Sequence, residues 1–285
     1  MKIDNFVLII GAMKCGTTSL FHYLCQHPQI SSPIFKEPNF FSYDERWHNG
    51  IEWYLSRWQN WNPKQHKIAL EASVNYSKIQ SYPKVISRIK TLKDHANFKF
   101  IYIVRDPIER IESHYTYDIA KRREKFETFS KAVDLELIET SKYAKQIEPY
   151  YNNFSKQDIL LINFDDLKLN SEKTVKKVCQ FLEIDPDYDF VELKKVYNST
   201  KNQIVDIKIW QFLRPIKPLR KVSKIFSPQQ KEKIRRLIGG KEINQNFKLS
   251  LAQKKYVLKE LNEDLKKLSE KYGVDLSSWN IDIET

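Results

Sequence analysis

The sequence predicts an α/β protein with a mostly parallel central sheet flanked by helices. Three observations indicate this class: short apolar runs recur along the chain, helical patterns separate them, and the first run passes through a glycine loop into a helix. The apolar runs lack alternation, which is typical of strands covered on both faces. Parallel strands need a crossover connection, and the intervening helical patterns supply it.

Each element follows from its own pattern. The predicted strands are the apolar runs at 6–10, 68–70, 100–104 and 159–162. Apolar residues at helical spacing predict helices at 17–25, 85–92 and 171–182, and a last, charged helix at 249–272. We expect one domain over 1–285, with a nucleotide-binding α/β core at 1–200 and a helical, basic C-terminal part at 201–285 that packs on the core.

Composition limits the classes of function. The 285 residues include 41% hydrophobic and 13% aromatic residues, enough to bury a full core. Three cysteines (Cys15, Cys25 and Cys179) lack metal-ligand spacing, so neither a disulfide framework nor a zinc site is predicted. The run at 6–10 is too short to span a bilayer, and no signal-peptide cleavage pattern follows it. We expect a cytoplasmic protein.

The net charge of +12 is partly concentrated between Lys208 and Arg236, where ten Lys or Arg residues accompany one acid, Glu232. The ordinary interpretation of such a run is a solvated surface. An anionic acceptor and a peripheral contact with a membrane or another anionic surface are the alternatives. No nucleic-acid-binding motif accompanies the charge, so nucleic acid is not expected as a partner.

The loop after the first strand has the features of an anion site. Residues 11–19 read Gly-Ala-Met-Lys-Cys-Gly-Thr-Thr-Ser before a helix, so backbone N–H groups and the positive end of the helix dipole face the turn. The P-loop of kinases has Lys after its second glycine, whereas Thr17 stands here and Lys14 is the loop's cation. An ordinary tight turn and a reactive Cys15 thiol are the alternative interpretations.

A second motif follows the third predicted strand. Asp106, Pro107 and Glu109 fit the N-cap, first and third positions of a helix, so local structure explains them. Arg105 is placed at the carboxyl end of a buried strand, where a guanidinium can bind a phosphate through two hydrogen bonds. Ser113 joins the same anion if the helix lies beside it, and is otherwise a surface residue.

Together the two segments resemble the paired signatures of the sulfotransferases that use 3′-phosphoadenosine 5′-phosphosulfate (PAPS), closer to their glycan-modifying and bacterial branch. Residues 14–20 are similar to the 5′-phosphosulfate loop and residues 105–115 to the 3′-phosphate motif, and further similarity at 154–182 and 273–279 extends over nearly the whole chain. The resemblance implies a P-loop-type fold and PAPS as co-substrate, with no metal required. It implies transfer of a sulfuryl group, by in-line displacement, to a hydroxyl or amine of a carbohydrate, glycolipid or other metabolite.

The resemblance also assigns the site. The donor-binding residues would be Lys14, Cys15, Gly16, Thr17, Thr18, Ser19, Arg105, Ser113 and Lys201. Lys14 would steady the 5′ leaving group, and Arg105 and Ser113 would hold the 3′-phosphate. Lys201 would be a further contact to that phosphate, unless it is simply part of an exposed turn.

On the acceptor side, Glu37 begins an E-x-x-F-F segment like that of the glycan-modifying branch, which makes Glu37 the candidate catalytic base. A surface glutamate paired with Lys36 is the alternative. Residues 71–76 resemble the family's acceptor lining, but Ala72 replaces a common lysine, which argues against a heparan-like polysulfated acceptor.

The acceptor stays open between a glycan and a small molecule. Four tryptophans either form a sugar-stacking platform or pack in the core: Trp47, Trp53, Trp58 and Trp61. Two other functions are carried as alternatives: a P-loop nucleotide kinase, and a non-catalytic protein that binds anions or membranes on the same fold. The kinase is disfavoured by Thr17 and by the lack of a strand ending in an aspartate for magnesium.

Overall fold

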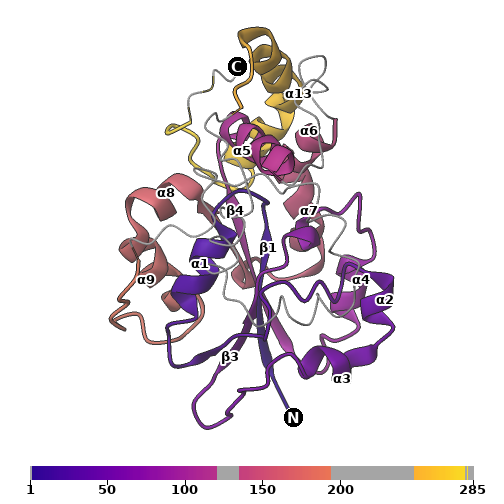
Figure 1. Ribbon diagram of the computed structural model, residues 1–285, viewed down its shortest axis with the longest axis vertical. Helices are drawn as coiled ribbons and strands as arrows, with labels where there is room; N and C mark the ends of the chain where they lie inside the picture. Colours follow the sequence, from indigo (N-terminus) through magenta and orange to yellow (C-terminus); the bar gives the residue numbers. More distant parts are fainter. Residues whose placement is uncertain (1, 121–134, 194–246, 280, 282–285) are drawn as a thin grey trace, which may run out of the picture.

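The computed structural model describes residues 2–120, 135–193, 247–279 and 281 (Figure 1). Five strands form one sheet: β1 (Asn5–Gly11), β2 (Ile30–Ser31), β3 (Ile68–Glu71), β4 (Asn97–Val104) and β5 (Ile159–Asn163). Their order across the sheet is β2-β3-β1-β4-β5, and every neighbouring pair is parallel. The predicted α/β class with a parallel central sheet is confirmed.

The apolar runs predicted four of the five strands. The strand they missed, β2, has two residues and pairs with β3 at the edge of the sheet, with Ile30 opposite Ile68. A strand of that length contains no repeat that a pattern could reveal.

The central strands are apolar on both faces because helices cover both faces of the sheet. Residues 6–10 of β1 and 100–104 of β4 are all buried, as expected for a covered parallel sheet. On one side lie α1 (Thr17–Leu24), α8 (Phe164–Leu169) and α9 (Ser171–Phe181), and on the other α4 (Val85–Lys90) and α7 (Tyr143–Asn153) (Figure 1). Shorter helical turns fill the connections: α2 (Asp44–Trp47), α3 (Gly50–Leu55), η1 (Val74–Ser77) and η2 (Lys156–Asp158).

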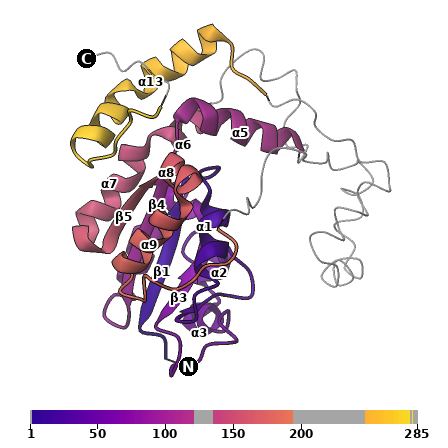
Figure 2. The same ribbon diagram turned by 90° about the vertical axis from the view of Figure 1, so that its left-hand side faces the viewer.

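Three helices lie beyond the carboxyl end of the sheet: α5 (Pro107–Ala120), α6 (Leu135–Ser141) and α13 (Leu251–Glu270) (Figures 1 and 2). The predicted C-terminal helix is therefore present as α13. Its Asp264 carboxylate accepts the backbone N–H groups of Ala144 at 2.9 Å and Lys145 at 2.8 Å, and so caps the start of α7. A side chain of α13 thereby satisfies N–H groups that α7 itself leaves unpaired.

Some predictions fall on other parts of the chain. Lys201 and the basic stretch 208–236 lie outside the described residues, and the division into a core at 1–200 and a basic part at 201–285 stays a prediction. Within the described ranges, no helix combines the length and the apolar character needed to cross a membrane.

Candidate functional site

The parallel arrangement brings the predicted motifs to one edge of the sheet. Gly11 ends β1, Val104 ends β4 and Asn163 ends β5, and these strands are neighbours. The loop at 11–16, the start of α5 and the start of α8 therefore meet at the carboxyl edge. This is the place where open α/β sheets bind ligands.

The loop at 11–16 has a backbone that only certain residues tolerate. Lys14 has φ of 72° and Gly16 has φ of 85°, so both are left-handed, and Gly16 directly precedes α1. A side chain at Gly16 would also begin 2.8 Å from the ring of Phe164 on α8. The glycine is needed for its conformation and for the close approach of α8 to the loop.

The hydroxyl residues of the motif form the first turn of α1. Thr17 and Ser19 are buried, and Thr18 is half-buried. The first N–H groups of a helix have no partner within the helix, and the positive end of its dipole lies there. The residue types and the N–H groups of this turn are those that an anion site uses, and the binding of an anion there stays a prediction.

Cys15 is the buried centre of the loop. Its Sγ lies 4.0 Å from the Tyr143 hydroxyl of α7, which itself donates to the Arg105 carbonyl at 2.7 Å. Burial raises the pKa of the Cys15 thiol to about 11, and the positive charges of Arg110, Arg105 and Lys14 oppose that rise. The thiol is protonated at neutral pH, which argues against a reactive cysteine, while three cations act on the loop.

Lys14 connects the loop to α5. Its Nζ lies 4.8 Å from the centroid of the Tyr117 ring, within the range of a cation–π contact. Ser113 is half-buried one turn before Tyr117, and so lies on the same face of α5. The helix therefore runs beside the loop, which is the condition that the predicted role of Ser113 required. No motif pointed to Tyr117; only its spacing of four residues from Ser113 could have done so.

Arg105 joins the two motifs directly. Its Nη1 donates to the Lys14 carbonyl at 3.2 Å, and its guanidinium lies 4.7 Å from the centroid of the Phe164 ring. Its Nε and Nη2 donate to Glu109 Oε2 at 3.2 and 2.6 Å. The side chain is 18% exposed, so Arg105 lies at the meeting point of the loop, α5 and α8.

At the start of α5, one of the two hydrogen bonds of the predicted capping box is present. Asp106 Oδ1 accepts the Glu109 N–H at 3.0 Å. The Glu109 carboxylate pairs with Arg105 instead of completing the capping box. The cap therefore holds the first turn of α5, while Glu109 orients the guanidinium toward the loop.

Glu37 lies in the connection between β2 and α2. Its Oε1 is 2.8 Å from Lys36 Nζ, and the two side chains are 37% and 17% exposed. The ion pair of the alternative interpretation therefore exists, and the carboxylate is still reachable. Buried Phe40 anchors the segment by stacking on Tyr54, with ring centroids 4.6 Å apart.

The sequence motifs predicted no separate role for Glu71. It is fully buried at the carboxyl end of β3, opposite Leu8 of β1. Its carboxylate accepts hydrogen bonds from the hydroxyls of Tyr54 at 2.7 Å, Tyr76 at 2.9 Å, and Ser73. Burial raises the pKa of Glu71 to about 7 although these three hydroxyls oppose the rise. The resemblance named Glu71 only as part of an acceptor lining.

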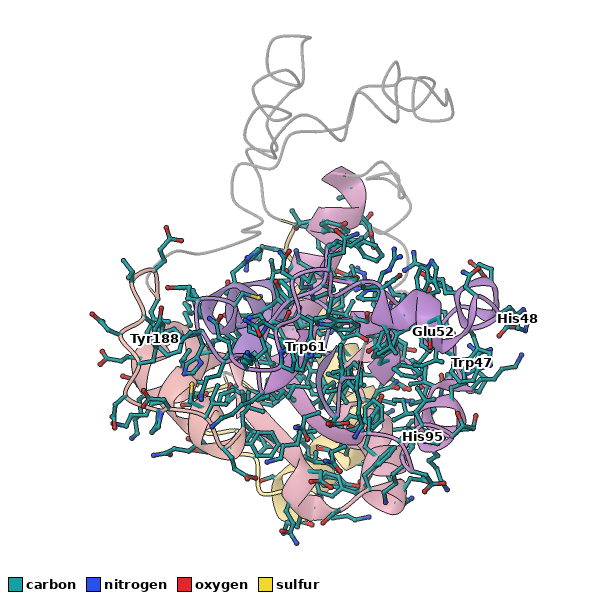
Figure 3. All side chains as sticks on the ribbon, turned by 90° about the horizontal axis from the view of Figure 1, so that it is seen from below. Trp47, His48, Glu52, Trp61, His95 and Tyr188 are labelled. Atoms are coloured by element: carbon teal, nitrogen blue, oxygen red, sulfur yellow. The ribbon has the colours of Figure 1, made fainter. Side chains whose placement is uncertain are left out.

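The tryptophans do not form one platform. Trp58 is fully buried and donates from Nε1 to the Ser31 carbonyl at 3.1 Å, so it belongs to the core. The other three are partly buried against the core. Figure 3, which looks onto the amino end of the sheet, shows Trp61 near its centre and Trp47 well apart from it.

A cavity of about 690 Å³ opens at this amino end. Its lining includes Asn5 and Asn97 at the start of β1 and β4, together with Trp61 and Lys67. Among the described residues, Trp61 is the one candidate acceptor residue in this lining, and none of the predicted donor-binding residues belongs to it. The cavity is therefore separate from the motifs at the carboxyl edge.

Comparisons with known proteins agree with this geometry. Residues 4–251 match the family described as "Sulfotransferase domain". The chain is 31% identical to heparan sulfate glucosamine 3-O-sulfotransferase 3B1 of Mus musculus over 187 residues, which is 61% of this chain and 45% of that protein. It is 29% identical to bifunctional heparan sulfate N-deacetylase/N-sulfotransferase 4 of Mus musculus over 205 residues, 65% of this chain and 23% of that protein. The chain thus spans less than half the length of these relatives.

A solved structure shows the same fold. The sulfotransferase from Alicyclobacillus acidocaldarius superposes with a TM-score of 0.67 over 99% of this chain and 100% of its own, at 20% identity. The predicted P-loop-type architecture is confirmed. With most of its length matched, the chain belongs to the sulfotransferase domain family, and the predicted resemblance to the PAPS-dependent sulfotransferases is confirmed.

Proposed function

We propose that this chain transfers a sulfuryl group from PAPS to a hydroxyl or amine of a carbohydrate acceptor. One observation carries the proposal: the Arg105 guanidinium donates to the Lys14 carbonyl at 3.2 Å, which unites two motifs that are distant in the sequence into one anion site. The charges of Arg110, Arg105 and Lys14 all act at the centre of the loop. A bisphosphorylated donor is the kind of ligand that such a concentration of cations favours.

The residues present fit the donor. The loop has left-handed backbone at Lys14 and at Gly16 directly before α1, which is typical of a turn whose N–H groups surround a phosphate at a helix N-terminus. We propose that Lys14 and the first turn of α1 (Thr17, Thr18 and Ser19) bind the 5′-phosphosulfate. Arg105 and Ser113 bind the 3′-phosphate, and Lys201, outside the described residues, is kept as a further contact.

The proposed chemistry uses these groups in two ways. PAPS supplies the sulfuryl group and a phosphate leaving group when it is bound. Lys14 and the N–H groups at the start of α1 stabilise the negative charge on that leaving group, and they are in place before the reaction. Glu37 accepts the proton of the acceptor hydroxyl. The charge stabilisation comes from side chains and a helix N-terminus, so the proposal includes no metal.

The carbohydrate class rests on the family membership and on the names of the relatives, two of which act on heparan sulfate. Ala72 lacks the cation that the family commonly has at that position, so a less sulfated glycan, a glycolipid or a small hydroxylated metabolite is a second candidate.

Two further predictions concern where the protein acts. Vesicle sedimentation tests the contact of residues 208–236 with a membrane or another anionic surface. Cell fractionation tests the cytoplasmic location.

Donor binding is tested by calorimetry. Adenosine 3′,5′-bisphosphate should bind at least tenfold more tightly than ATP with magnesium; the reverse preference would support the kinase alternative and exclude the proposal. Lys14→Ala and Arg105→Ala should weaken bisphosphate binding. The matched control is Lys67→Ala, because Lys67 lies at the opposite end of the sheet and its loss should leave the affinity unchanged.

Transfer is tested with ³⁵S-labelled PAPS and a panel of heparan sulfate, chondroitin, a glycolipid and a simple phenol. Label should appear in at least one carbohydrate. Binding of the bisphosphate without transfer to any acceptor would favour the non-catalytic alternative. Glu37→Gln should lose turnover and keep bisphosphate affinity, and retained turnover would remove Glu37 from the mechanism.

A further inference from the structure

The backbone around Glu37 is tied to the residues that follow β3. The segment between β2 and α2 contains no helix or strand, so its hydrogen bonds decide where it lies. Arg46 of α2 donates to the Glu37 and Pro38 carbonyls, and the remaining support comes from the residues after β3. Three hydrogen bonds make the connection: Ala72 N–H to the Lys36 carbonyl at 3.0 Å, Asn39 N–H to Ser73 Oγ at 2.9 Å, and Phe41 N–H to the Tyr76 hydroxyl at 3.4 Å. They hold the backbone before and after Glu37.

Two of these bonds depend on where a hydroxyl oxygen is held. A hydroxyl has one proton to donate and two lone pairs that accept. The Ser73 and Tyr76 hydroxyls both donate to the Glu71 carboxylate, and their lone pairs accept the N–H groups of Asn39 and Phe41. Glu71 thereby fixes the positions of the two oxygens to which these N–H groups donate.

Glu71 is an unusual choice for a purely structural position. It is fully buried, and the three groups that donate to it are neutral hydroxyls. Burying a carboxylate among neutral groups is unfavourable, and an amide could accept the same two tyrosine hydroxyls. An amide could not also accept the Ser73 proton, because that proton is accepted at the second oxygen, Oε2, where an amide would have an NH2 group. Ser73 would then have to turn its proton away from residue 71, and its oxygen is the acceptor of the Asn39 N–H.

We propose that Glu71 is the positioning residue of Glu37: by accepting the protons of Ser73 and Tyr76 it fixes the backbone that carries the base. The role rests on the proposed function, in which Glu37 takes the acceptor proton. Reacting groups must be held within a fraction of an ångström, because a displacement of about 1 Å can lower turnover on the order of 100-fold. Asn39, with φ of 50°, shows that the segment adopts a backbone that needs such support.

Protonation of Glu71 should loosen this arrangement. The added carboxyl proton would compete with the proton of Ser73, and one of the two would lose its acceptor. The groups that face Glu71 are Tyr54, Ser73, Tyr76 and Glu37, with Tyr150 of α7 near enough to feel its charge. Because burial raises the pKa of Glu71 to about 7, turnover should rise with pH through this region, and Glu71→Gln should lack that rise.

The experiment compares Ser73→Ala and Glu71→Gln with the control Tyr54→Phe. The control removes one donor to the same carboxylate and touches neither backbone bond. Amide exchange in residues 36–41 is measured by mass spectrometry, with 100–104 of β4 as the internal reference. Turnover uses labelled PAPS and heparan sulfate, or the panel acceptor that the wild type prefers, and bisphosphate affinity is measured by calorimetry.

We expect Ser73→Ala and Glu71→Gln to speed exchange at 36–41 and to lower turnover at saturating acceptor by about tenfold or more. Bisphosphate affinity should stay within about twofold. All variants are compared above pH 8, where Glu71 is ionised, and there Tyr54→Phe should behave as the wild type in all measurements. Ser73→Ala deletes a single oxygen, so it decides the outcome if Glu71→Gln folds poorly.

Unchanged exchange or unchanged turnover in Ser73→Ala overturns the inference. If Glu37→Gln loses turnover while Ser73→Ala keeps it, only the positioning role fails. If Glu37→Gln itself keeps turnover, the assignment of the base fails, and the positioning role fails with it.

Discussion

The buried carboxylate of Glu71 makes the stability of the protein depend on pH in a way that one substitution should remove. Burial raises the pKa of Glu71 from its ordinary value of 4.5 to about 7. The folded state therefore holds the proton more tightly than the unfolded state does. The stability that this proton contributes is complete below about pH 4.5 and is lost as the pH rises through 7.

The size of the effect follows from the two pKa values. A difference of about 2.5 at about 1.4 kcal/mol per pKa unit gives about 3–4 kcal/mol lost from the free energy of unfolding between low pH and pH 8. Glu71→Gln removes this loss and costs about 1 kcal/mol, because the bond with Ser73 must reorganise. We expect the variant to be about 1 kcal/mol less stable than the wild type below pH 4.5 and about 2–3 kcal/mol more stable at pH 8.

Urea unfolding followed by tryptophan fluorescence at several pH values between 4.5 and 8 measures this difference. Every other titrating group is common to both proteins, so the difference isolates Glu71. Tyr54→Phe serves as a control for the loss of one hydrogen bond, and its effect should vary much less with pH. A variant that is less stable than the wild type by the same amount at every pH would refute the reasoning, because Glu71 would then ionise normally in the folded state.

Three further predictions concern the loop and α13. Gly16→Ala should lower the free energy of unfolding by about 1–3 kcal/mol and weaken bisphosphate binding, because the added carbon would lie 2.8 Å from Phe164 in a left-handed backbone. Thermal melting measures the first effect and calorimetry the second, and unchanged values in both would contradict the prediction. Cys15 should resist iodoacetamide at pH 8 in the folded protein and react in urea, because burial raises the pKa of its thiol to about 11; rapid labelling of the folded state, seen by mass spectrometry, would contradict this. Asp264→Ala should lower the free energy of unfolding by about 1–3 kcal/mol because two N–H groups of α7 lose their acceptor, and a change within error in urea unfolding would contradict the capping role.

Local patterns were enough to predict much of the fold and one side of the site. Continuous apolar runs predicted β1, β3, β4 and β5, because a strand covered on both faces needs apolar residues throughout. Glycine spacing and the lone cation Lys14 predicted an anion loop, and the position of Arg105 after β4 predicted the partner motif. These features are local, since each depends on residues that are neighbours in the sequence.

Contacts between distant residues were decided only by the tertiary structure. The stacking of Arg105 on Phe164 and the position of Lys14 over Tyr117 depend on how the elements pack and on which rotamers they allow. The burial of Glu71 depends on its place between neighbouring strands and on hydroxyls from α3 and η1.

The sequence by itself determined the class of fold and predicted an anion site at the end of β1, because periodicity and backbone conformation are set by nearby residues. The tertiary structure decided which cations share that site and how the segment that carries Glu37 is held. The physical reason is that burial and hydrogen-bond direction belong to an environment assembled from several elements, and no single segment contains that environment.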